Sequence, residues 1–370
     1  MEIIHIVLGK ANPERMNGVN KVVHQLATKQ TEFGEKVSVW GITNDLEKNY
    51  GDRNYKTELF LKKVNPFFIS RFLKESILAK KNKAVFHFHG GWIPVFYTLS
   101  KLLYKNNIAF VYTPHGAYNT IAMQRSSWRK KIYFSLFEKK LLENSTKIHC
   151  IGKSEVTGLD RIFKNNKCIL LPYGYENNTV VLVEKSNNAE IIFGFIGRLD
   201  IYTKGLDTLL EAFQKFQIKV PDSKLWIIGD SPEKVLLEKQ LKGKAFAQNV
   251  ILFGSKFGEE KNDLLKKIDV FVHPSRNEGL PLSVIEAASF GKPCIVTDAT
   301  NIGQLIVNNH AGRTIYIQSS NLLENAMSDL FSCWKNPNDF IEIQHNAIKM
   351  VHENYNWKQL ISRFNLELYH

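Results

Sequence analysis

The chain has 370 residues, 44% of them hydrophobic and 23% charged, which excludes a disordered polymer and allows two domains of ordinary size. Its 49 Lys and Arg residues against 36 Asp and Glu residues give a net charge of +13. This excess favours an anionic partner, such as a phosphorylated small molecule, nucleic acid or an anionic membrane surface, although a solvated lysine-rich surface explains it equally well.

The four cysteines are too widely spaced for a disulfide framework or a zinc cluster, and no CxxC pair occurs. The first residues, MEIIHIVLGK, are unlike a secretory signal. No stretch approaches the roughly 20 apolar residues that span a bilayer. We therefore expect a reduced, cytoplasmic protein that is soluble or at most peripheral on the inner face of a membrane.

Short β-branched runs alternate with amphipathic segments in the first half of the chain. The expected strands are 3–9, 36–42, 84–90, 108–114, 147–152 and 168–172. Helical patterns lie between them, as at 18–30 and 128–144. Strands separated by helices indicate a parallel sheet covered on both faces, so residues 1–172 are predicted to form one Rossmann-like α/β domain.

Residues 173–189 break this rhythm and are predicted to be a linker. A second series of expected strands follows at 191–197, 224–230, 249–255, 268–274, 292–298 and 311–317. It predicts a second doubly wound domain at 190–354. A terminal helix at about 355–370 is free to pack on either domain, including back on the first. Two such domains facing a central cleft would bind ligands there, at the carboxyl ends of their strands.

Several familiar motifs fail when their context is checked. CIGKS (150–154) imitates the end of a phosphate-binding loop, but Lys147 stands where the first glycine is needed. YTLSK (97–101) has a dehydrogenase spacing, yet no GxGxxG follows the first strand. The absence of GxSxG, HExxH and DxD removes support for a serine hydrolase, a zinc protease and a metal-bridged nucleotide-sugar site.

Two cations follow the first strand of the second domain. Arg198 comes directly after the strand, and Lys204 and Gly205 stand where a helix is expected to begin. Arg offers a rigid fork for phosphate, Lys a mobile charge, and a helix start adds oriented amides. Together they indicate a diphosphate cradle, with a solvated cation pair as the alternative.

The stretch PSRNEGLPLSVIEAASFGKP (274–293) places two glutamates across a loop-to-helix junction. Gly279 and Pro281 shape a turn, and the amides of Leu282 and Ser283 are expected to be free at the start of the helix that carries Glu286. Free amides there attract phosphate oxygens. An ordinary carboxylate near a helix start is the alternative for Glu286 taken alone.

These segments resemble the retaining glycosyltransferases of family 4, which have the two-domain GT-B fold. The pair Glu278 and Glu286, separated by seven residues, carries the resemblance together with GRLDIYTKGLDTLLEAF (197–213). In the first domain, NGVNKVV, FHFHGGW, TPHGAYN and LPYGYE are similar to family segments in the same order. Two positions depart from the family pattern: Gly18 stands as a single glycine in the first loop, and Tyr173 replaces the usual Asn.

The resemblance implies a site, a donor and a mechanism. Glu286 would bond the ribose hydroxyls of the nucleotide, Glu278 would lie against the transferred sugar, and His115 would lie near that sugar. Arg198 and Lys204 would stabilise the leaving diphosphate without a metal ion. The other implied donor-binding positions are Gly18, Phe257, Gly279, Leu280, Leu282 and Ser283. The donor would be a nucleotide-sugar, most simply a UDP-sugar, used as a substrate with no cofactor.

The implied reaction is metal-independent transfer of the hexosyltransferase type with retention of anomeric configuration. No second carboxylate is evidently placed as a nucleophile, so we favour front-face attack. Two alternatives belong to other classes: a nucleotide-sugar epimerase of the same fold, which needs no acceptor, and a basic module that binds polysaccharide or nucleic acid, which needs no phosphate cradle.

The segment 125–144 combines apolar residues at helical spacing with a cluster of cations. Trp128, Ile132, Leu136 and Phe137 are expected to face the core of the first domain. The cations are Arg125, Arg129, Lys130, Lys131, Lys139 and Lys140. A cluster of this size predicts reversible attachment to an anionic leaflet. It suits a glycan acceptor on a lipid carrier, in the assembly of bacterial capsule, cell-wall or lipopolysaccharide sugars.

Overall fold

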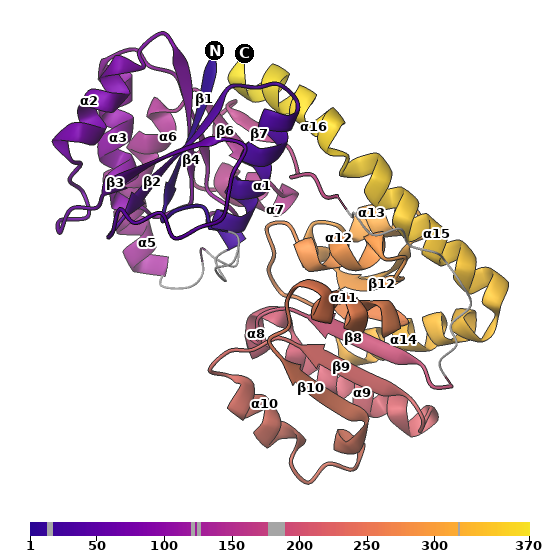
Figure 1. Cartoon of the computed structure of the whole chain (residues 1–370). Helices are drawn as coiled ribbons and strands as arrows, with labels where there is room; N and C mark the ends of the chain where they lie inside the picture. Colours follow the sequence, from indigo (N-terminus) through magenta and orange to yellow (C-terminus); the bar gives the residue numbers. More distant parts are fainter. Residues whose placement is uncertain (13–17, 120–122, 124–126, 177–188, 317–318) are drawn as a thin grey trace. The chain divides into compact units, whose positions relative to one another are not determined.

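The structure, a computed structural model, describes residues 1–12, 18–119, 123, 127–176, 189–316 and 319–370. The chain divides into two compact units, whose elements are labelled in Figure 1. The first unit is Met1–Gly174 with Trp357–His370, and the second is Tyr175–Asn356. The predicted linker 173–189 contains this division, and its residues 177–188 lie outside the described part of the chain.

The first unit is built on a parallel sheet of seven strands. The strands are β1 (Glu2–Leu8), β2 (Val37–Thr43), β3 (Lys56–Leu61), β4 (Ala84–His89), β5 (Phe110–Thr113), β6 (Lys147–Cys150) and β7 (Cys168–Leu170). Their order is β3-β2-β1-β4-β5-β6-β7. All were predicted except the edge strand β3, whose residues are mostly exposed or half-buried and so lack the apolar run that marks the central strands.

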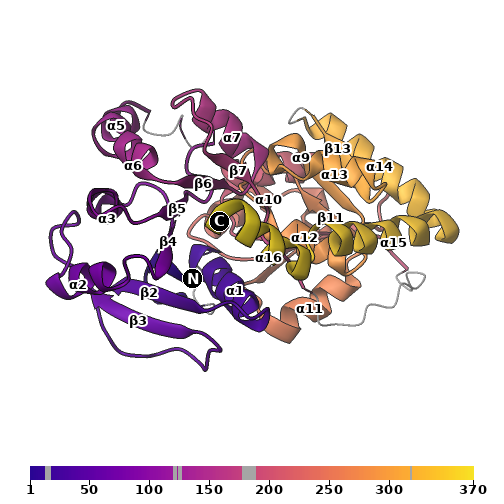
Figure 2. The same cartoon turned by 90° about the horizontal axis from the view of Figure 1, so that it is seen from above.

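Helices pack on this sheet, and one of them comes from the end of the sequence. They are α1 (Gly18–Glu32), α2 (Arg71–Ala79), α3 (Pro94–Lys105), α5 (Ser127–Tyr133), α6 (Lys139–Asn144), α7 (Lys153–Asp160) and α16 (Trp357–Phe364), with π-helical turns η1 (Phe134–Glu138) and η4 (Asn365–Tyr369). Helix α16 lies beside α1 (Figure 2). Trp357 packs on Gly174, where a Cβ atom would lie 2.3 Å from the indole ring, so only glycine allows this approach.

The second unit repeats the same topology with six parallel strands. They are β8 (Ile192–Ile196), β9 (Lys224–Ile228), β10 (Val250–Gly254), β11 (Val270–His273), β12 (Cys294–Thr297) and β13 (Gly312–Ile315). Their order, β10-β9-β8-β11-β12-β13, is the Rossmann order, with the direction of winding reversing between β8 and β11. Each of these strands lies within a range predicted from the sequence.

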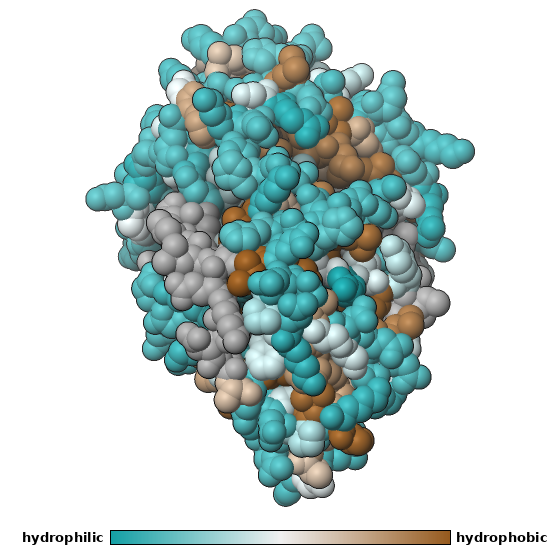
Figure 3. All heavy atoms as spheres, turned by 90° about the vertical axis from the view of Figure 1, so that its right-hand side faces the viewer, coloured by the Kyte–Doolittle hydropathy of each residue, from teal (hydrophilic) through white to brown (hydrophobic). Residues whose placement is uncertain are grey.

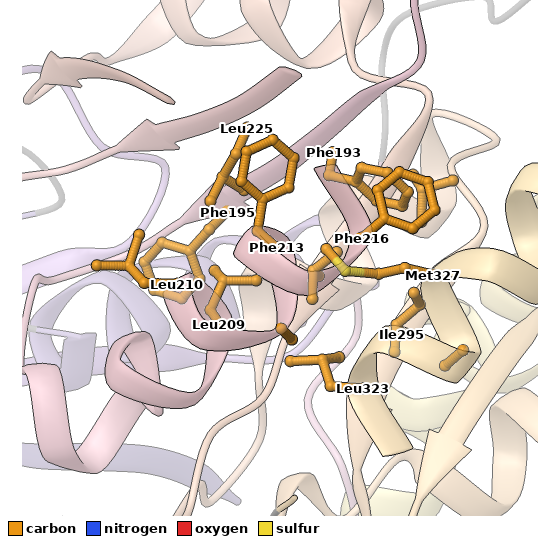
Figure 4. Close-up of a cluster of buried hydrophobic side chains, with 14 of the residues drawn as sticks. Phe193, Phe195, Leu209, Leu210, Phe213, Phe216, Leu225, Ile295, Leu323 and Met327 are labelled. Atoms are coloured by element: carbon orange, nitrogen blue, oxygen red, sulfur yellow. The ribbon is translucent and has the colours of Figure 1, made fainter. Parts of the chain in front are cut away.

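Helices cover both faces of this second sheet. They are α8 (Ile201–Lys204), α9 (Leu206–Lys219), α10 (Lys234–Leu241), α11 (Gly258–Lys267), α12 (Leu282–Ser289), α13 (Gly303–Asn308), α14 (Ser320–Lys335) and α15 (Pro337–Asn354), with 3-10 turns η2 (Ala245–Asn249) and η3 (Asp298–Thr300). Figure 4 shows the core on one face, where Phe216 of α9 packs against Phe193 of β8 and Met327 of α14 belongs to the same cluster. This aromatic-rich core holds the loops at the strand ends in place.

The surface is mainly hydrophilic on the face shown in Figure 3, and its hydrophobic residues form small groups. None of the helices in the described ranges is both long enough and apolar enough to cross a membrane.

Candidate functional site

The candidate site of the second unit lies at the carboxyl ends of β8 and β11, which pair directly in the sheet. Because the winding direction reverses between these two strands, the loops that follow them leave toward opposite faces, which is the position where sheets of this kind usually bind ligands. The predicted residues Arg198 and Lys204 follow β8, and Glu278 follows β11. The topology therefore brings two segments about 75 residues apart to one edge of the sheet.

The segment after β8 folds into a short helical turn that carries Lys204. The side chain of Asp200 caps this turn by accepting a hydrogen bond of 2.8 Å from the Thr203 amide. Gly205 ends it in the left-handed conformation (φ 68°), which favours glycine. Sequence analysis expected a helix to begin at Lys204 and Gly205. Instead Lys204 ends α8 and the longer helix α9 begins at Leu206.

The loop after β11 is held from both sides by hydrogen bonds. On one side, the Ser275 hydroxyl and the Arg276 amide both donate to the carbonyl of Thr203, at 2.9 and 2.8 Å. On the other side, the Asn301 amide group donates to the carbonyls of Glu278 and Gly279, at 2.7 and 3.0 Å. These bonds fix the backbone that carries Glu278 before any ligand binds.

Glu278 forms the centre of the site. Its carboxylate is ion-paired with Lys204 and accepts a hydrogen bond of 2.8 Å from Nε2–H of His273, while only 12% of its side chain is exposed. Burial by itself raises the pKa of Glu278, but the Lys204 charge and the His273 hydrogen bond outweigh it and lower the pKa to about 2. Glu278 is therefore ionised at neutral pH, and Lys204 is held as its partner.

His273, which sequence analysis did not select, positions this carboxylate. The ring is 1% exposed and stacks on Phe195 at 5.4 Å between centroids. Burial lowers the pKa of His273, which keeps the ring neutral. Its place as the last residue of a buried strand, five residues before Glu278, was a usable signal.

Glu286 makes a second ion pair, with Lys261 of α11. Both side chains are largely buried, with 18% of Glu286 and 16% of Lys261 exposed. Lys261 was missed because α11 carries several lysines and nothing in its spacing distinguishes this one. The two glutamates thus each hold a lysine at this edge of the sheet.

The other predicted donor-binding residues lie in less constrained surroundings. Arg198 is 67% exposed and pairs with Asp200 at 3.4 Å, and Phe257 is 65% exposed at the start of α11. The expectation for Leu282 was wrong, because its amide donates to the carbonyl of Leu280 at 3.0 Å and is not free. The turn at Pro281 closes on itself there. Gly279 lies in the loop held by Asn301, and Ser283 lies in the first turn of α12.

Gly18 and His115 belong to the first unit. Gly18 is the exposed first residue of α1. His115 follows β5 with a left-handed φ of 55°, and its ring stacks on Tyr173 at 5.8 Å. The buried carboxyl of Glu155 accepts a 2.6 Å hydrogen bond from the Gly116 amide and so supports this strained turn. The departure at Tyr173 thus supplies a surface for the His115 ring.

Buried histidines gather on the first sheet, from the middle of β1 and β4 to the carboxyl end of β4. Ligand atoms of His5, His87 and His89 all lie within 4.8 Å of one another, a spacing compatible with a metal ion. The sequence indicated only a histidine-rich strand end at 86–92. His5 lies about 80 residues away and joins the group through the pairing of β1 with β4.

The expectation that the apolar residues of 128–137 face the core was wrong for three of the four. Trp128, Ile132 and Leu136 are 63%, 52% and 59% exposed, and their spacing of four residues places them along one helical stripe. Only Phe137 packs inward, against Phe67 at 4.7 Å. Arg129 and Lys131 are exposed beside the stripe and Lys130 is half-buried, whereas Arg125 lies outside the described residues.

Comparison with known proteins gives matches over most of the chain. A family model described as "Glycosyltransferase Family 4" matches residues 16–176, and one described as "Glycosyl transferases group 1" matches residues 183–347. A sulfoquinovosyl transferase of Arabidopsis thaliana is 28% identical over 165 residues, which is 45% of this chain and 31% of that protein. An uncharacterized glycosyltransferase of Methanocaldococcus jannaschii is 26% identical over 62% of this chain and 60% of its own length. The chain thus matches less than two thirds of the length of these relatives.

Solved structures share the fold over the whole chain. Sucrose-phosphate synthase from Thermosynechococcus elongatus superposes with a TM-score of 0.79 at 20% identity, covering 99% of this chain and 97% of that one. Anabaena HepE in complex with UDP-glucose superposes with a TM-score of 0.73 at 13% identity, covering 100% and 99%. Both sheets of this chain therefore have the GT-B architecture that was predicted from the sequence.

Proposed function

Because this chain belongs to the family 4 and group 1 glycosyltransferases of the GT-B fold, we propose that it moves a sugar from a nucleotide-sugar, most simply a UDP-sugar, to a glycan acceptor. The observation that carries the proposal is the Lys204–Glu278 pair at the reversal point of the second sheet. There a fixed cation adjoins a carboxylate that stays ionised. The UDP-glucose complex of the Anabaena protein supports the choice of uridine.

In the proposed ground state, the donor diphosphate lies against Lys204 and Arg198. The exposed Arg198 is able to leave Asp200, since an exposed ion pair of this kind contributes only about 0–1 kcal/mol. Glu286 accepts hydrogen bonds from the ribose hydroxyls, and Glu278 accepts them from the transferred sugar. A carboxylate suits hydroxyl pairs because it is an acceptor only.

The proposed reaction retains the anomeric configuration. The bond between the anomeric carbon and the phosphate oxygen breaks, and the acceptor oxygen bonds to the same face of that carbon. The acceptor proton passes to the leaving phosphate oxygen, and the two cations stabilise the negative charge that develops. This division of roles needs no metal ion, so transfer is expected to persist in EDTA.

The test is a transfer assay with a panel of nucleotide-sugars, preceded by a thermal-shift screen of the nucleoside diphosphates. We expect UDP to raise the melting temperature and Lys204→Ala to abolish that shift. A new sugar nucleotide formed from donor alone would identify an epimerase instead. If no nucleotide changes the melting temperature, a binding module is favoured, and a strict requirement for manganese or magnesium would contradict the metal-free cradle.

The exposed stripe on α5 and η1 favours a lipid-linked acceptor at an anionic membrane surface. Trp128, Ile132 and Leu136 project beside exposed cations, the arrangement of a helix that lies in a membrane interface. Each cation near an anionic leaflet contributes about 1 kcal/mol, which gives reversible attachment. We place the enzyme on the cytoplasmic face of a bacterial membrane, in the assembly of capsule, cell-wall or lipopolysaccharide glycans.

Sedimentation with anionic liposomes at low and high salt tests this surface. Changing Arg129, Lys130 and Lys131 to Glu is expected to abolish binding, and Trp128→Ser with Ile132→Ser is expected to weaken the binding that survives high salt. The matched control changes three exposed lysines of the second unit, Lys239, Lys242 and Lys244, to Glu. Equal losses in both charge variants would mean that net charge, not this stripe, drives binding.

A further inference from the structure

A chain of buried hydrogen bonds runs through the first unit, from the backbone carbonyl of Leu171 to His115. Its first part begins at His149, whose Nε2 lies 2.8 Å from the Leu171 oxygen and whose Nδ1 lies 2.8 Å from the Thr113 hydroxyl. That hydroxyl lies 2.6 Å from Nε2 of His87, and Nδ1 of His87 lies 2.8 Å from the Tyr369 hydroxyl.

Gln30 of α1 joins this part to the second. Its amide nitrogen lies 3.2 Å from the Tyr369 hydroxyl, and its amide oxygen lies 2.7 Å from Nε2 of His5. Nδ1 of His5 lies 2.9 Å from Nε2 of His89, and Nδ1 of His89 lies 3.1 Å from Nε2 of His115. Gln30, His5 and His89 are at most 1% exposed, so water does not substitute for these partners.

The direction of every bond follows from one group, because a backbone carbonyl only accepts. His149 must donate from Nε2 to Leu171, so its Nδ1 accepts from Thr113. The Thr113 oxygen then accepts from Nε2–H of His87, and Nδ1 of His87 accepts from Tyr369. The Tyr369 oxygen is left to accept from an N–H of Gln30.

This orientation turns the oxygen of Gln30 toward His5. His5 then donates from Nε2 to Gln30 and accepts at Nδ1 from Nε2–H of His89. His89 in turn accepts at Nδ1 from His115. His115 must donate from Nε2 to His89. In the reverse orientation, every bond is formed except the last, where Nε2 of His149 would place a lone pair 2.8 Å from the Leu171 oxygen. That repulsion selects one direction for the whole chain.

The five histidine rings are neutral, so each has one nitrogen that donates and one that accepts. Burial lowers the pKa of His5 to about 4, of His115 to about 3 and of His149 to about 4, and lowers the pKa of His87 and His89 well below the usual range. A metal at His5, His87 and His89 would need lone pairs that these bonds already use, and no carboxylate belongs to that cluster in the described residues.

We propose that the Leu171 carbonyl, acting through this chain, fixes His115 as the Nε2–H tautomer, with Gln30 and Tyr369 as positioning residues. Nδ1 of His115, which has no hydrogen-bond partner among the described residues, is then an acceptor. If the chain has the proposed function, this nitrogen accepts a hydrogen bond from a hydroxyl of the substrate and cannot donate to an oxyanion.

The test reads the tautomers directly by two-bond ¹H–¹⁵N correlation in protein labelled at histidine, with His115→Asn to assign the signal. We expect the Nε2–H tautomer at His115 in the wild type. Tyr369→Phe removes the link between the two parts and is expected to add Nδ1–H tautomer at His115 and to shift His5 and His89. Tyr112→Phe is the matched control, because it also removes a buried hydroxyl of the first unit. That hydroxyl donates to Glu138, which is not part of the series of hydrogen bonds from Leu171 to His115.

An Nδ1–H or charged His115 in the wild type would overturn the proposal. So would a Tyr369→Phe spectrum identical to the wild type, equal changes in Tyr112→Phe, or one equivalent of metal in the purified protein. In a transfer assay, Tyr369→Phe is expected to lower kcat roughly 2- to 10-fold with the KM for donor nearly unchanged. Absence of any transfer would count against the proposed function alone, since the tautomer spectrum does not depend on it.

Discussion

The carboxyl edges of the two sheets share a strand order but differ in the charge state of their side chains. In the second unit the edge carries ion pairs, Lys204 with Glu278 and Lys261 with Glu286. In the first unit it carries neutral imidazoles joined by hydrogen bonds, such as His89 with His115. On the proposed function, the shared strand order sets where a ligand would bind, and the side chains at the strand ends set whether that edge suits a polyanion or uncharged hydroxyls.

Removing Lys204, the cation paired with Glu278, should have the largest effect on activity. Lys204→Ala leaves the carboxylate of Glu278 buried with only His273 as partner, and removes the charge proposed to stabilise the diphosphate. We expect kcat/KM to fall about 10²- to 10³-fold. The control is Lys215→Ala, which removes a lysine from an exposed pair with Glu211 and should leave kcat/KM unchanged. Similar losses in both variants would contradict the special role of Lys204.

Glu286→Ala should have the next largest effect. The variant removes the proposed acceptor of the ribose hydroxyls and leaves Lys261 without its partner, which we expect to weaken donor binding by roughly 2–4 kcal/mol. Calorimetric titration with the donor measures this loss. Glu278→Gln should instead lower turnover more than binding. Wild-type turnover in both variants would refute the assignment of the two glutamates.

The histidine-rich edge and the charged edge should also differ in their response to acid. Five fully buried histidines of the first unit have folded pKa values below the unfolded value, so their contribution to stability is present above about pH 6.5 and is lost as the pH falls toward the folded values. They are His5, His87, His89, His115 and His149.

Two carboxyls of the first unit oppose this trend. Burial raises the pKa of Glu138 to about 7 and of Glu155 to about 8, so their contribution is present at low pH and is lost as the pH rises. Five imidazoles outnumber two carboxyls, which leaves a net loss of stability between about pH 6.5 and pH 5. The second unit has one buried counterpart, His273, whose pKa is also lowered by burial. Glu278 loses its contribution to stability only as the pH falls toward about 2.

Amide exchange measured by mass spectrometry at pH 7 and pH 5.5, corrected for intrinsic rates, checks this difference. We expect β1 and β4 to lose more protection than β8 and β11. Equal losses in the two sheets would mean that the imidazole chain does not govern the acid response.

The smallest effect is expected at Phe257. Its ring is 65% exposed, and we expect the base to contact the backbone at this position, so Phe257→Ala should change the Kd for UDP less than about threefold. The same titration measures it. A loss of tenfold or more would show that the ring itself stacks on the base and would sharpen the description of the charged edge.

The sequence was sufficient for the central strands, because each is a short β-branched run bounded by turns. The family spacing also singled out Glu278 and Glu286, each of which is ion-paired with a lysine, while their roles toward a donor stay predictions. The sequence was insufficient for β3, whose half-exposed residues lack that run. It also missed Lys261, whose partner is set by tertiary packing, and His273, although its place at the end of a buried strand was a usable signal. The stripe at Trp128 was assigned to the core by periodicity alone, and periodicity does not say whether anything covers a helix face.

The departure at Tyr173 shows a further limit of sequence comparison. A substitution in a family motif is usually interpreted first as the loss of the function of the replaced residue. Here the ring of Tyr173 is buried between His115 and Phe364, with centroids 5.8 and 6.0 Å away. The new side chain therefore fills a structural role that the family pattern does not describe.

The position of Tyr369 also has a consequence for biosynthesis. The hydroxyl that completes the first unit lies 282 residues after His87 and 339 residues after Gln30, with the whole second unit between them. During translation, residues 1–174 emerge long before their last buried partner exists. Until the ribosome has made α16 and η4, His87 and Gln30 each lack one of their two hydrogen-bond partners in the core, and Trp357 is absent from Gly174. The unit that is synthesised first is therefore the last to mature, and its nascent form is the stage most open to chaperones and proteases.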